Sequence, residues 1–145
     1  MNKWDKNFLE LAKTVSTFSK DPSTQVGAVI ADDDNRVISI GYNGFPKGVK
    51  DDHRLDNREL KYEMIVHAEA NALLFANASV KGCTIYTWPF QPCSRCASLI
   101  IQAGIRRVVS VENKDQKWCE NFQLAHDMMT EARIDIVSYS GFVTP

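Results

Sequence analysis

The sequence predicts an α/β fold in which helices cover both faces of a mixed five-stranded sheet. Three observations lead to this prediction. Apolar residues repeat at helical spacing in several segments, short β-branched runs alternate with those segments, and the first two runs are separated only by an acidic turn at residues 32–35. The chain has 145 residues, 44% of them hydrophobic, which is enough for one domain with a core, residues 1–145.

The first part of the chain predicts a helix followed by a hairpin. In residues 2–20, apolar side chains recur every three or four positions and predict one buried stripe, formed by Trp4, Phe8, Leu11, Val15 and Phe18. Pro22 ends this helix, because proline disfavours helical geometry in the residue before it. Residues 26–31 and 36–42 are β-branched and predict the hairpin. Residues 50–61 mix both charges, as a solvated loop or helix face does.

In the second part, helices alternate with strands. Residues 63–78 predict a helix whose buried side carries Ala70, Leu73 and Leu74. Residues 83–88 and 107–111 predict strands, with a helix over residues 93–103 between them that ends at Gly104. Asp115 is a suitable N-cap for a helix over residues 116–133, and residues 134–138 predict the last strand. Because a long helix separates the last two strands, we expect them to be parallel.

Charge and cysteine content narrow the functional classes. The formal net charge is −1, without the basic excess of proteins that bind polyphosphate backbones, which favours a small substrate. Of the four cysteines, Cys83 and Cys119 lie in apolar contexts and predict reduced core thiols. The sequence shows neither a charged leader followed by an apolar run nor a stretch of about 18 apolar residues, so we expect a cytoplasmic protein.

Three candidate metal ligands occur in two motifs, H-A-E at residues 67–69 and P-C-S-R-C at residues 92–96. A catalytic zinc ion has three protein ligands and a water, whereas a structural zinc ion has four protein ligands. Cys93 and Cys96 would share the first turn of a helix, where free backbone N–H groups and the helix dipole favour thiolates. The sequence therefore predicts one zinc ion, Zn2+, bound by His67, Cys93 and Cys96.

Glu69 is the candidate catalytic residue. On a helix that begins near His67, Glu69 points to a different side, so it is not placed to share the metal but can reach a water beside it. The two cysteines alone would also fit a redox pair, half of a structural zinc site or plain core residues. The missing fourth ligand and the free carboxyl of Glu69 favour a catalytic zinc.

The loop at residues 43–48 and the segment after it contain further candidates. Asn43 and Gly44 form either a tight turn or a place where the Asn43 amide contacts a ligand. His53 lies among carboxylates and arginines and is interpreted as a surface histidine. Basic side chains just before the H-A-E motif are available to pair a phosphate, and they are Lys47, Lys50, Arg54, Arg58 and Lys61.

The two motifs in this order resemble the cytidine deaminase superfamily, in which H-x-E precedes P-C-x-x-C. Residues 19–28, 41–48, 67–72 and 99–105 are similar to the deoxycytidylate (dCMP) deaminase branch, and the likeness runs from about residue 8 to residue 109. The zinc motif indicates the superfamily, while residues 20–27 and 41–48 select the branch. The resemblance implies the three-layer cytidine-deaminase-like fold.

The resemblance also implies an activity, zinc-dependent hydrolytic deamination of dCMP to dUMP and ammonia in pyrimidine nucleotide metabolism. It implies that His67, Cys93 and Cys96 hold zinc, that Glu69 moves protons, and that Asn43 and Ala68 contact the substrate. Members of this branch are often hexamers that dCTP activates and dTTP inhibits. The resemblance therefore implies a homo-oligomer, a hexamer or a dimer, with these two effectors.

Two features depart from the family pattern. Residues 87–92, in the loop that borders the base, are one residue longer than usual, and the region before the H-A-E motif offers His53 without the cysteine of a second zinc site. The alternatives to a dCMP deaminase are a deaminase of cytidine, CMP, dCTP or tRNA adenosine, and a non-catalytic nucleotide-sensing paralogue. The near-neutral charge disfavours a tRNA substrate, and Glu69 disfavours a pure binding protein.

Overall fold

The computed structural model describes residues 1–112 and 119–140 of the chain. Within them, one sheet is built from the strands β1 (Gly27–Ala31), β2 (Val37–Tyr42), β3 (Thr84–Trp88), β4 (Arg107–Val111) and β5 (Asp135–Tyr139). The order is β2-β1-β3-β4-β5. Strand β1 runs antiparallel to both of its neighbours, whereas β3, β4 and β5 are parallel. The predicted hairpin, the mixed sheet and the parallel last pair are confirmed.

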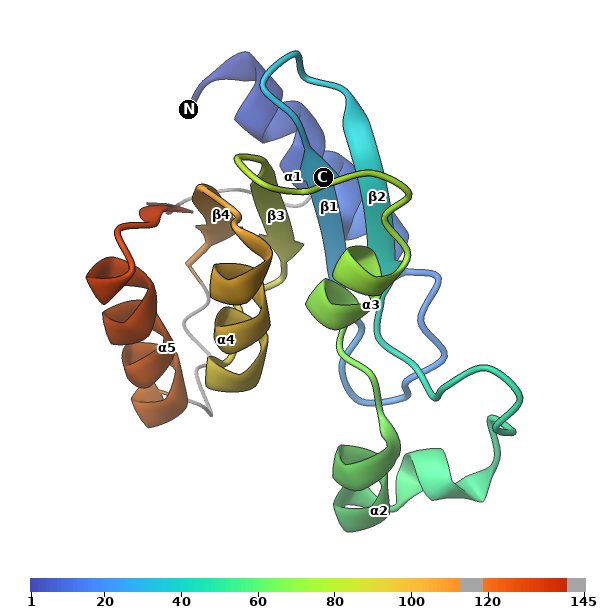
Figure 1. The fold of residues 1–145 in the computed structure, drawn as a ribbon. Coiled ribbons are helices and arrows are strands. Elements are labelled where there is room, and N and C mark those ends of the chain that lie inside the picture. The colour runs from blue at the N-terminus through green and yellow to red at the C-terminus, as the bar shows by residue number, and fades with distance from the viewer. Residues whose placement is uncertain (113–118, 141–145) are drawn as a thin grey trace.

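Helices cover both faces of this sheet (Figure 1). Helix α1 (Lys3–Ser16) packs on one face, and α3 (Ala68–Leu74), α4 (Ser94–Ala103) and α5 (Cys119–Glu131) pack on the other. Successive side chains of a strand point to opposite faces, so β1 contributes Ala28 and Ile30 to one core and Val29 and Ala31 to the other. The result is the expected three-layer arrangement.

The buried face of α1 differs from the prediction at both ends. Phe8 and Val15 are buried as expected, but Trp4 and Phe18 are 43% and 52% exposed. Phe18 lies beyond the end of the helix at Ser16, where helical spacing no longer sets its direction, and it packs edge-on against Tyr42 at 5.9 Å between ring centroids. Smaller residues of the same helix, Leu9 and Ala12, complete the buried stripe.

The predicted helix over residues 63–78 is wrong in its extent. The chain forms a short 3-10 helix η1 (His53–Asp56) and α2 (Arg58–Met64), leaves helical geometry at Ile65, and begins again with α3. Val66 donates to and accepts from the backbone of Gly44, at 2.8 and 3.1 Å. Because Ile65 and Val66 are β-branched, this extended pairing suits them better than helix does. The break makes His67 the N-cap residue of α3.

The predicted buried side of this helix is wrong at Leu74, although Leu73 packs, partly buried, against the core as expected. Ala68, Glu69 and Ala72 are buried, whereas Leu74 is 74% exposed. Helix α3 lies directly on β2, because a Cβ at Gly41 would meet the Ala68 carbonyl oxygen at 2.3 Å. Only glycine allows this approach, which brings the first turn of α3 against the sheet.

The remaining expectations are mostly confirmed. Helix α4 ends at Gly104 in left-handed geometry with φ 85°, and Cys83 is a buried free thiol. The side chain of His53 is 86% exposed. In the predicted helix over residues 116–133, apolar residues recur every three or four positions, and of these Phe122, Ala125 and Met129 are buried but Ala132 is exposed. The predicted cap Asp115 and the side chain of Cys119 lie outside the described residues. Across the part of the chain that is described, no helix has the length and apolar character needed to cross a membrane.

Candidate metal centre and active site

The three predicted metal ligands come together between the first turns of α3 and α4. The Nδ1 atom of His67 lies 3.4 Å from the Sγ atom of Cys93 and 3.4 Å from that of Cys96. All three donor atoms lie within 4.8 Å of one another. His67 and Cys93 are the N-cap residues of their helices, so both ligands stand where the chain turns into a helix.

This donor set fits a zinc ion. Zinc binds thiolate sulfur at about 2.3 Å and imidazole nitrogen at about 2.0–2.1 Å, so two such ligands in tetrahedral geometry are about 3.6 Å apart. The observed nitrogen–sulfur separations of 3.4 Å agree with this value. Within the described residues, His67, Cys93 and Cys96 form the grouping of possible metal ligands, which leaves the fourth tetrahedral position for a non-protein ligand.

The two cysteines differ in their acidity. A hydrogen bond from Cys96, and a second from His67, lower the pKa of Cys93 to about 4 against the opposing effect of burial. The same contact with Cys93, together with burial, raises the pKa of Cys96. The lowered pKa favours the thiolate form of Cys93, which is the form that binds a cation.

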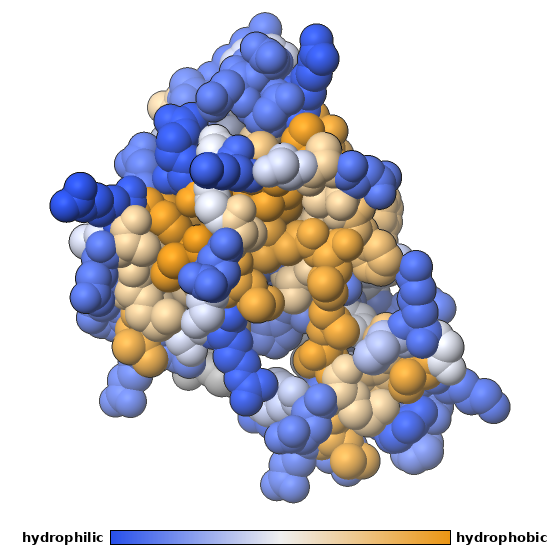
Figure 2. Space-filling model, in the orientation of Figure 1, coloured by the Kyte–Doolittle hydropathy of each residue, from blue (hydrophilic) through white to orange (hydrophobic). Residues whose placement is uncertain are grey.

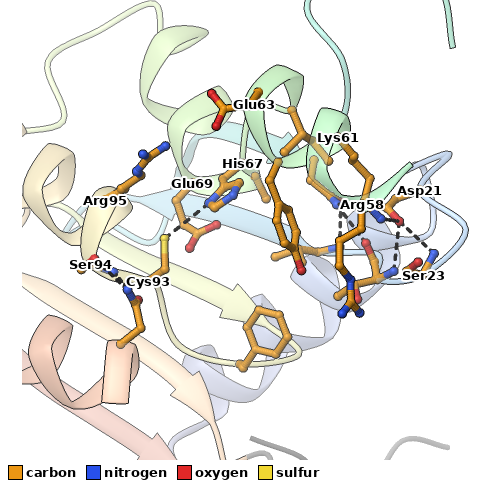
Figure 3. A pocket seen from close by; sticks show the side chains of 18 of the residues that line it. Asp21, Ser23, Arg58, Lys61, Glu63, His67, Glu69, Cys93, Ser94 and Arg95 are labelled. Atoms are coloured by element: carbon orange, nitrogen blue, oxygen red, sulfur yellow. Dashed lines mark hydrogen bonds and ion pairs between the residues drawn. The ribbon is translucent and has the colours of Figure 1, made fainter. Parts of the chain in front are cut away.

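Glu69 lies beside the metal ligands on the first turn of α3. Its side chain is only 4% exposed, and Figure 3 shows its carboxylate facing the same space as Cys93. Burial raises the pKa of Glu69 to about 7, the charge of Cys93 adds to this effect, and His67 opposes it. A carboxyl group whose pKa is near neutrality can both take and give a proton at physiological pH.

Glu69 and two of the metal ligands, His67 and Cys93, form one side of a cavity of about 340 Å³. The other side consists of residues from the loop after α1, the start of the segment after β2, and α2. Phe90 and Phe122 also line the cavity, with their ring centroids 5.5 Å apart. This volume lies within the range of pockets that bind small molecules.

Asn43 and Ala68, the predicted substrate contacts, both line this cavity. The Asn43 side chain is buried and holds neighbouring loops together, because its Oδ1 accepts from the Val26 N–H at 2.9 Å and its Nδ2 donates to the Thr24 carbonyl at 2.9 Å. Asn43 is thus more than a turn residue. Ala68 is buried in the first turn of α3, where backbone N–H groups lack acceptors within the helix.

A buried ion pair stands next to Asn43. Lys61 Nζ lies 3.1 Å from Asp21 Oδ1, and the two side chains are 8% and 3% exposed. The Asp21 carboxylate also accepts hydrogen bonds from the backbone N–H groups of Ser23 and Thr24. The prediction that residues 50–61 are solvated is therefore wrong at Lys61, whose partner lies 40 positions earlier in the chain.

Helix α5 fixes the start of α4. The Asn121 Oδ1 atom accepts from the Ser94 N–H at 2.9 Å, and its Nδ2 donates to Ser94 Oγ at 3.0 Å. Gln91 Nε2 donates to the Phe122 carbonyl at 2.9 Å. The loop at residues 87–92 is thus held against α5, and it borders the cavity through Phe90. Asn121 and Phe122 could not be predicted as site residues, because no motif near them in the sequence indicates a site.

Known proteins identify the family. The sequence model of the "Cytidine and deoxycytidylate deaminase zinc-binding region" matches residues 2–112. The chain belongs to this family. This deaminase is 45% identical over 139 residues to the Aliivibrio fischeri "Uncharacterized deaminase in luxG 3'region", covering 94% of this chain and 93% of that one. It is 41% identical over 145 residues to the Caenorhabditis elegans "Probable deoxycytidylate deaminase", covering 97% and 70% of the two chains.

The fold of this deaminase also has solved relatives. The dCMP deaminase of cyanophage S-TIM5, in complex with dCMP and dUMP, superposes with a TM-score of 0.72 over 96% of this chain and 99% of that one, at 20% identity. The predicted three-layer deaminase fold is confirmed. The family and the His67, Cys93 and Cys96 set make this chain a zinc-dependent deaminase, as its motifs indicated.

Proposed function

We propose that this deaminase converts dCMP and water to dUMP and ammonia. The observation that carries the proposal is the cavity in which Glu69 stands beside His67, Cys93 and Cys96. The choice of dCMP is supported by the similarity to the probable deoxycytidylate deaminase of Caenorhabditis elegans and by the fold shared with a dCMP-bound phage enzyme.

In this mechanism His67, Cys93 and Cys96 hold the zinc ion, which when bound supplies a Lewis acid that activates water. Glu69 accepts a proton from the attacking water and delivers one to N3 of the cytosine ring. This protonation makes C4 electrophilic, and water oxygen adds there. Glu69 then takes the remaining proton from the hydroxyl group on C4 and passes it to the departing amino group, so that the C4–N bond breaks, ammonia leaves and the C4 oxygen remains as the carbonyl of dUMP.

Two further residues orient the base and the sugar. The Ala68 N–H, which has no acceptor within α3, is available to donate to the base. Asn43 contacts the sugar, while its hydrogen bonds to Val26 and Thr24 keep it in place. Burial of Glu69 and Ala68 excludes water from the reacting atoms and strengthens these polar contacts.

We also propose that the chain forms a homo-oligomer and responds to dCTP and dTTP, as the resemblance implies. Large apolar side chains are exposed on the helical face opposite α1, and these are Leu74, Phe75, Leu99 and Leu124. Figure 2 shows apolar residues gathered on that side of the molecule. Contiguous apolar surface of this kind favours association with another chain. Light scattering coupled to size-exclusion chromatography tests assembly, and a monomer at micromolar concentration would contradict it.

An ammonia-release assay tests the substrate. Zinc-loaded protein is incubated separately with dCMP, CMP, dCTP, deoxycytidine and tRNA, with and without the two effectors. We expect dCMP to give the highest kcat/KM, since the mechanism needs a cytosine base and the family relatives act on its deoxynucleotide. Absence of ammonia from dCMP, or a higher kcat/KM for another substrate, would overturn the proposal.

A further inference from the structure

The cavity has two ends of different chemistry. One group of lining residues consists of His67, Cys93 and Glu69, and another of Asp21, Asn43, Lys61 and Arg58. Figure 3 shows Glu69 and Cys93 on one side of the opening and Asp21, Lys61 and Arg58 on the other. A nucleotide has the same polarity, with its base at one end and its phosphate at the other. With the base at Glu69, the phosphate belongs at the α2 end, and a cation is required there.

Lys61 does not meet that requirement. Its ammonium group is buried and lies 3.1 Å from Asp21, whose side chain is 3% exposed. The positive charge of Lys61 is therefore already balanced, and withdrawing it from Asp21 would leave a buried carboxylate without its partner. Lys61 instead anchors α2 to the loop after α1, and so acts as a positioning residue.

The other basic candidates lie elsewhere. Arg54 pairs with Asp52 at 2.8 Å, and Lys47 stacks on the Phe75 ring at 4.5 Å from its centroid; neither lines the cavity. Arg95 lines the cavity on α4, but Figure 3 shows it on the side of Ser94 and Cys93, away from Arg58 and Lys61. None of these side chains is placed to meet a phosphate at the α2 end.

Arg58 has the required position and free donors. It is the first residue of α2, three positions before Lys61, and so lies on the same helix face. Its side chain is exposed to the cavity, and within the described residues it makes no hydrogen bond or ion pair. A guanidinium group offers two parallel N–H donors that match two phosphate oxygens.

We infer that Arg58 binds the 5'-phosphate of the substrate and thereby makes this deaminase prefer a nucleotide to a nucleoside. The inference rests on the proposed function, because it requires a nucleoside monophosphate in the cavity. Lys61 contributes by holding α2 so that Arg58 faces the opening. The phosphate closes the α2 end of the cavity, while the base occupies the end with Glu69.

The test compares Arg58→Ala with wild type on two substrates, dCMP and deoxycytidine. We expect kcat/KM for dCMP to fall about 10- to 100-fold, since hydrogen bonds between charged groups contribute this much. The value for deoxycytidine should stay within about twofold. Arg58→Lys should recover part of the preference, because lysine keeps the charge but loses the paired donors. Arg54→Ala, which removes a charge outside the cavity, should keep the wild-type ratio of kcat/KM for dCMP to kcat/KM for deoxycytidine.

Binding gives a second measurement that does not depend on turnover. Calorimetry with zinc-loaded protein should show dUMP binding weakened about 10- to 100-fold by Arg58→Ala, and deoxyuridine binding unchanged. If Arg58→Ala weakens the binding of dUMP and of deoxyuridine equally, or leaves the ratio of their affinities as in wild type, Arg58 does not bind the phosphate. If wild type itself prefers deoxycytidine, the proposed function fails as well, so the two failures are distinguishable.

Discussion

At the scale of single residues, the site depends on one carboxyl group that has no ligand role. Glu69 is buried beside His67 and Cys93, and its pKa is raised to about 7. We predict that Glu69→Gln keeps zinc and fold but loses about 10²–10⁴-fold or more in kcat, because an amide cannot carry the proton. Steady-state kinetics on metal-loaded protein checks this. Glu10→Gln, a matched change at an exposed position of α1, should leave kcat unchanged; substantial turnover by the Glu69 variant would contradict the assignment.

The metal ligands give a second prediction at this scale. Cys93→Ala should lose zinc and lower the melting temperature, because metal binding and folding are coupled. Cys83→Ala is the matched control, since Cys83 is also a free thiol but is buried away from the cavity. It should lose some stability yet keep one zinc per chain. Atomic emission spectroscopy measures the metal content, and a zinc-replete Cys93 variant would show that the ligand set is wrong.

At the scale of elements, the site depends on how α5 meets α4. Asn121 satisfies the backbone N–H of Ser94, which lies between the two cysteine ligands. We predict that Asn121→Ala costs about 1 kcal/mol of stability, as the loss of a helix cap does, and speeds zinc loss to a chelator. Gln123→Ala removes an exposed contact on the same helix and should change neither quantity measurably. Equal zinc-release rates in both variants would mean that Asn121 does not position the ligands.

At the scale of the whole molecule, a buried carboxylate joins distant elements. Asp5 of α1 accepts two hydrogen bonds from Arg107 of β4, both at 2.7 Å, and others from Tyr86 of β3 and Tyr139 of β5. Burial by itself would raise the pKa of Asp5, but the hydrogen bonds and the charge of Arg107 together hold it below its ordinary value. The folded state therefore binds this proton less readily than the unfolded chain does.

The sign of the pH dependence follows. The stabilisation from Asp5 is fully present above its unfolded pKa, near 3.8, and is lost as pH falls through the lower folded pKa. We predict that Asp5→Asn lowers the free energy of unfolding at pH 7 by about 3–5 kcal/mol and flattens its loss in acid. Asp33→Asn breaks an exposed ion pair and should cost less than about 1 kcal/mol. Urea unfolding between pH 7 and pH 3 measures the free energy of unfolding of each protein. If this free energy falls with pH in parallel for Asp5→Asn and wild type, Asp5 does not cause the loss of stability in acid.

Across these scales, the sequence could predict what is local. The spacing of Cys93 and Cys96 and of His67 and Glu69 is set by one helical turn, so the motifs alone indicated which groups meet a metal. Strands and helices could be told apart because apolar residues repeat about every 2 residues in a strand and about every 3.6 residues in a helix. The break at Ile65 could not be predicted, because it depends on the bridge between Val66 and Gly44, which tertiary packing alone creates.

The sequence by itself determined most of the individual strands and helices and the two zinc-ligand motifs, since each of these depends on residues close together in the chain. Only the tertiary structure decided which cation is free beside α2 at the cavity, because Lys61 is neutralised by Asp21, 40 positions away, while Arg58 is not paired within the described residues. It likewise brought Asn121 to Ser94, 27 positions apart. Whether a charge is paired, or a helix end is capped, depends on which distant residue folding brings into contact with it. The spacing of residues along the chain does not reveal that partner.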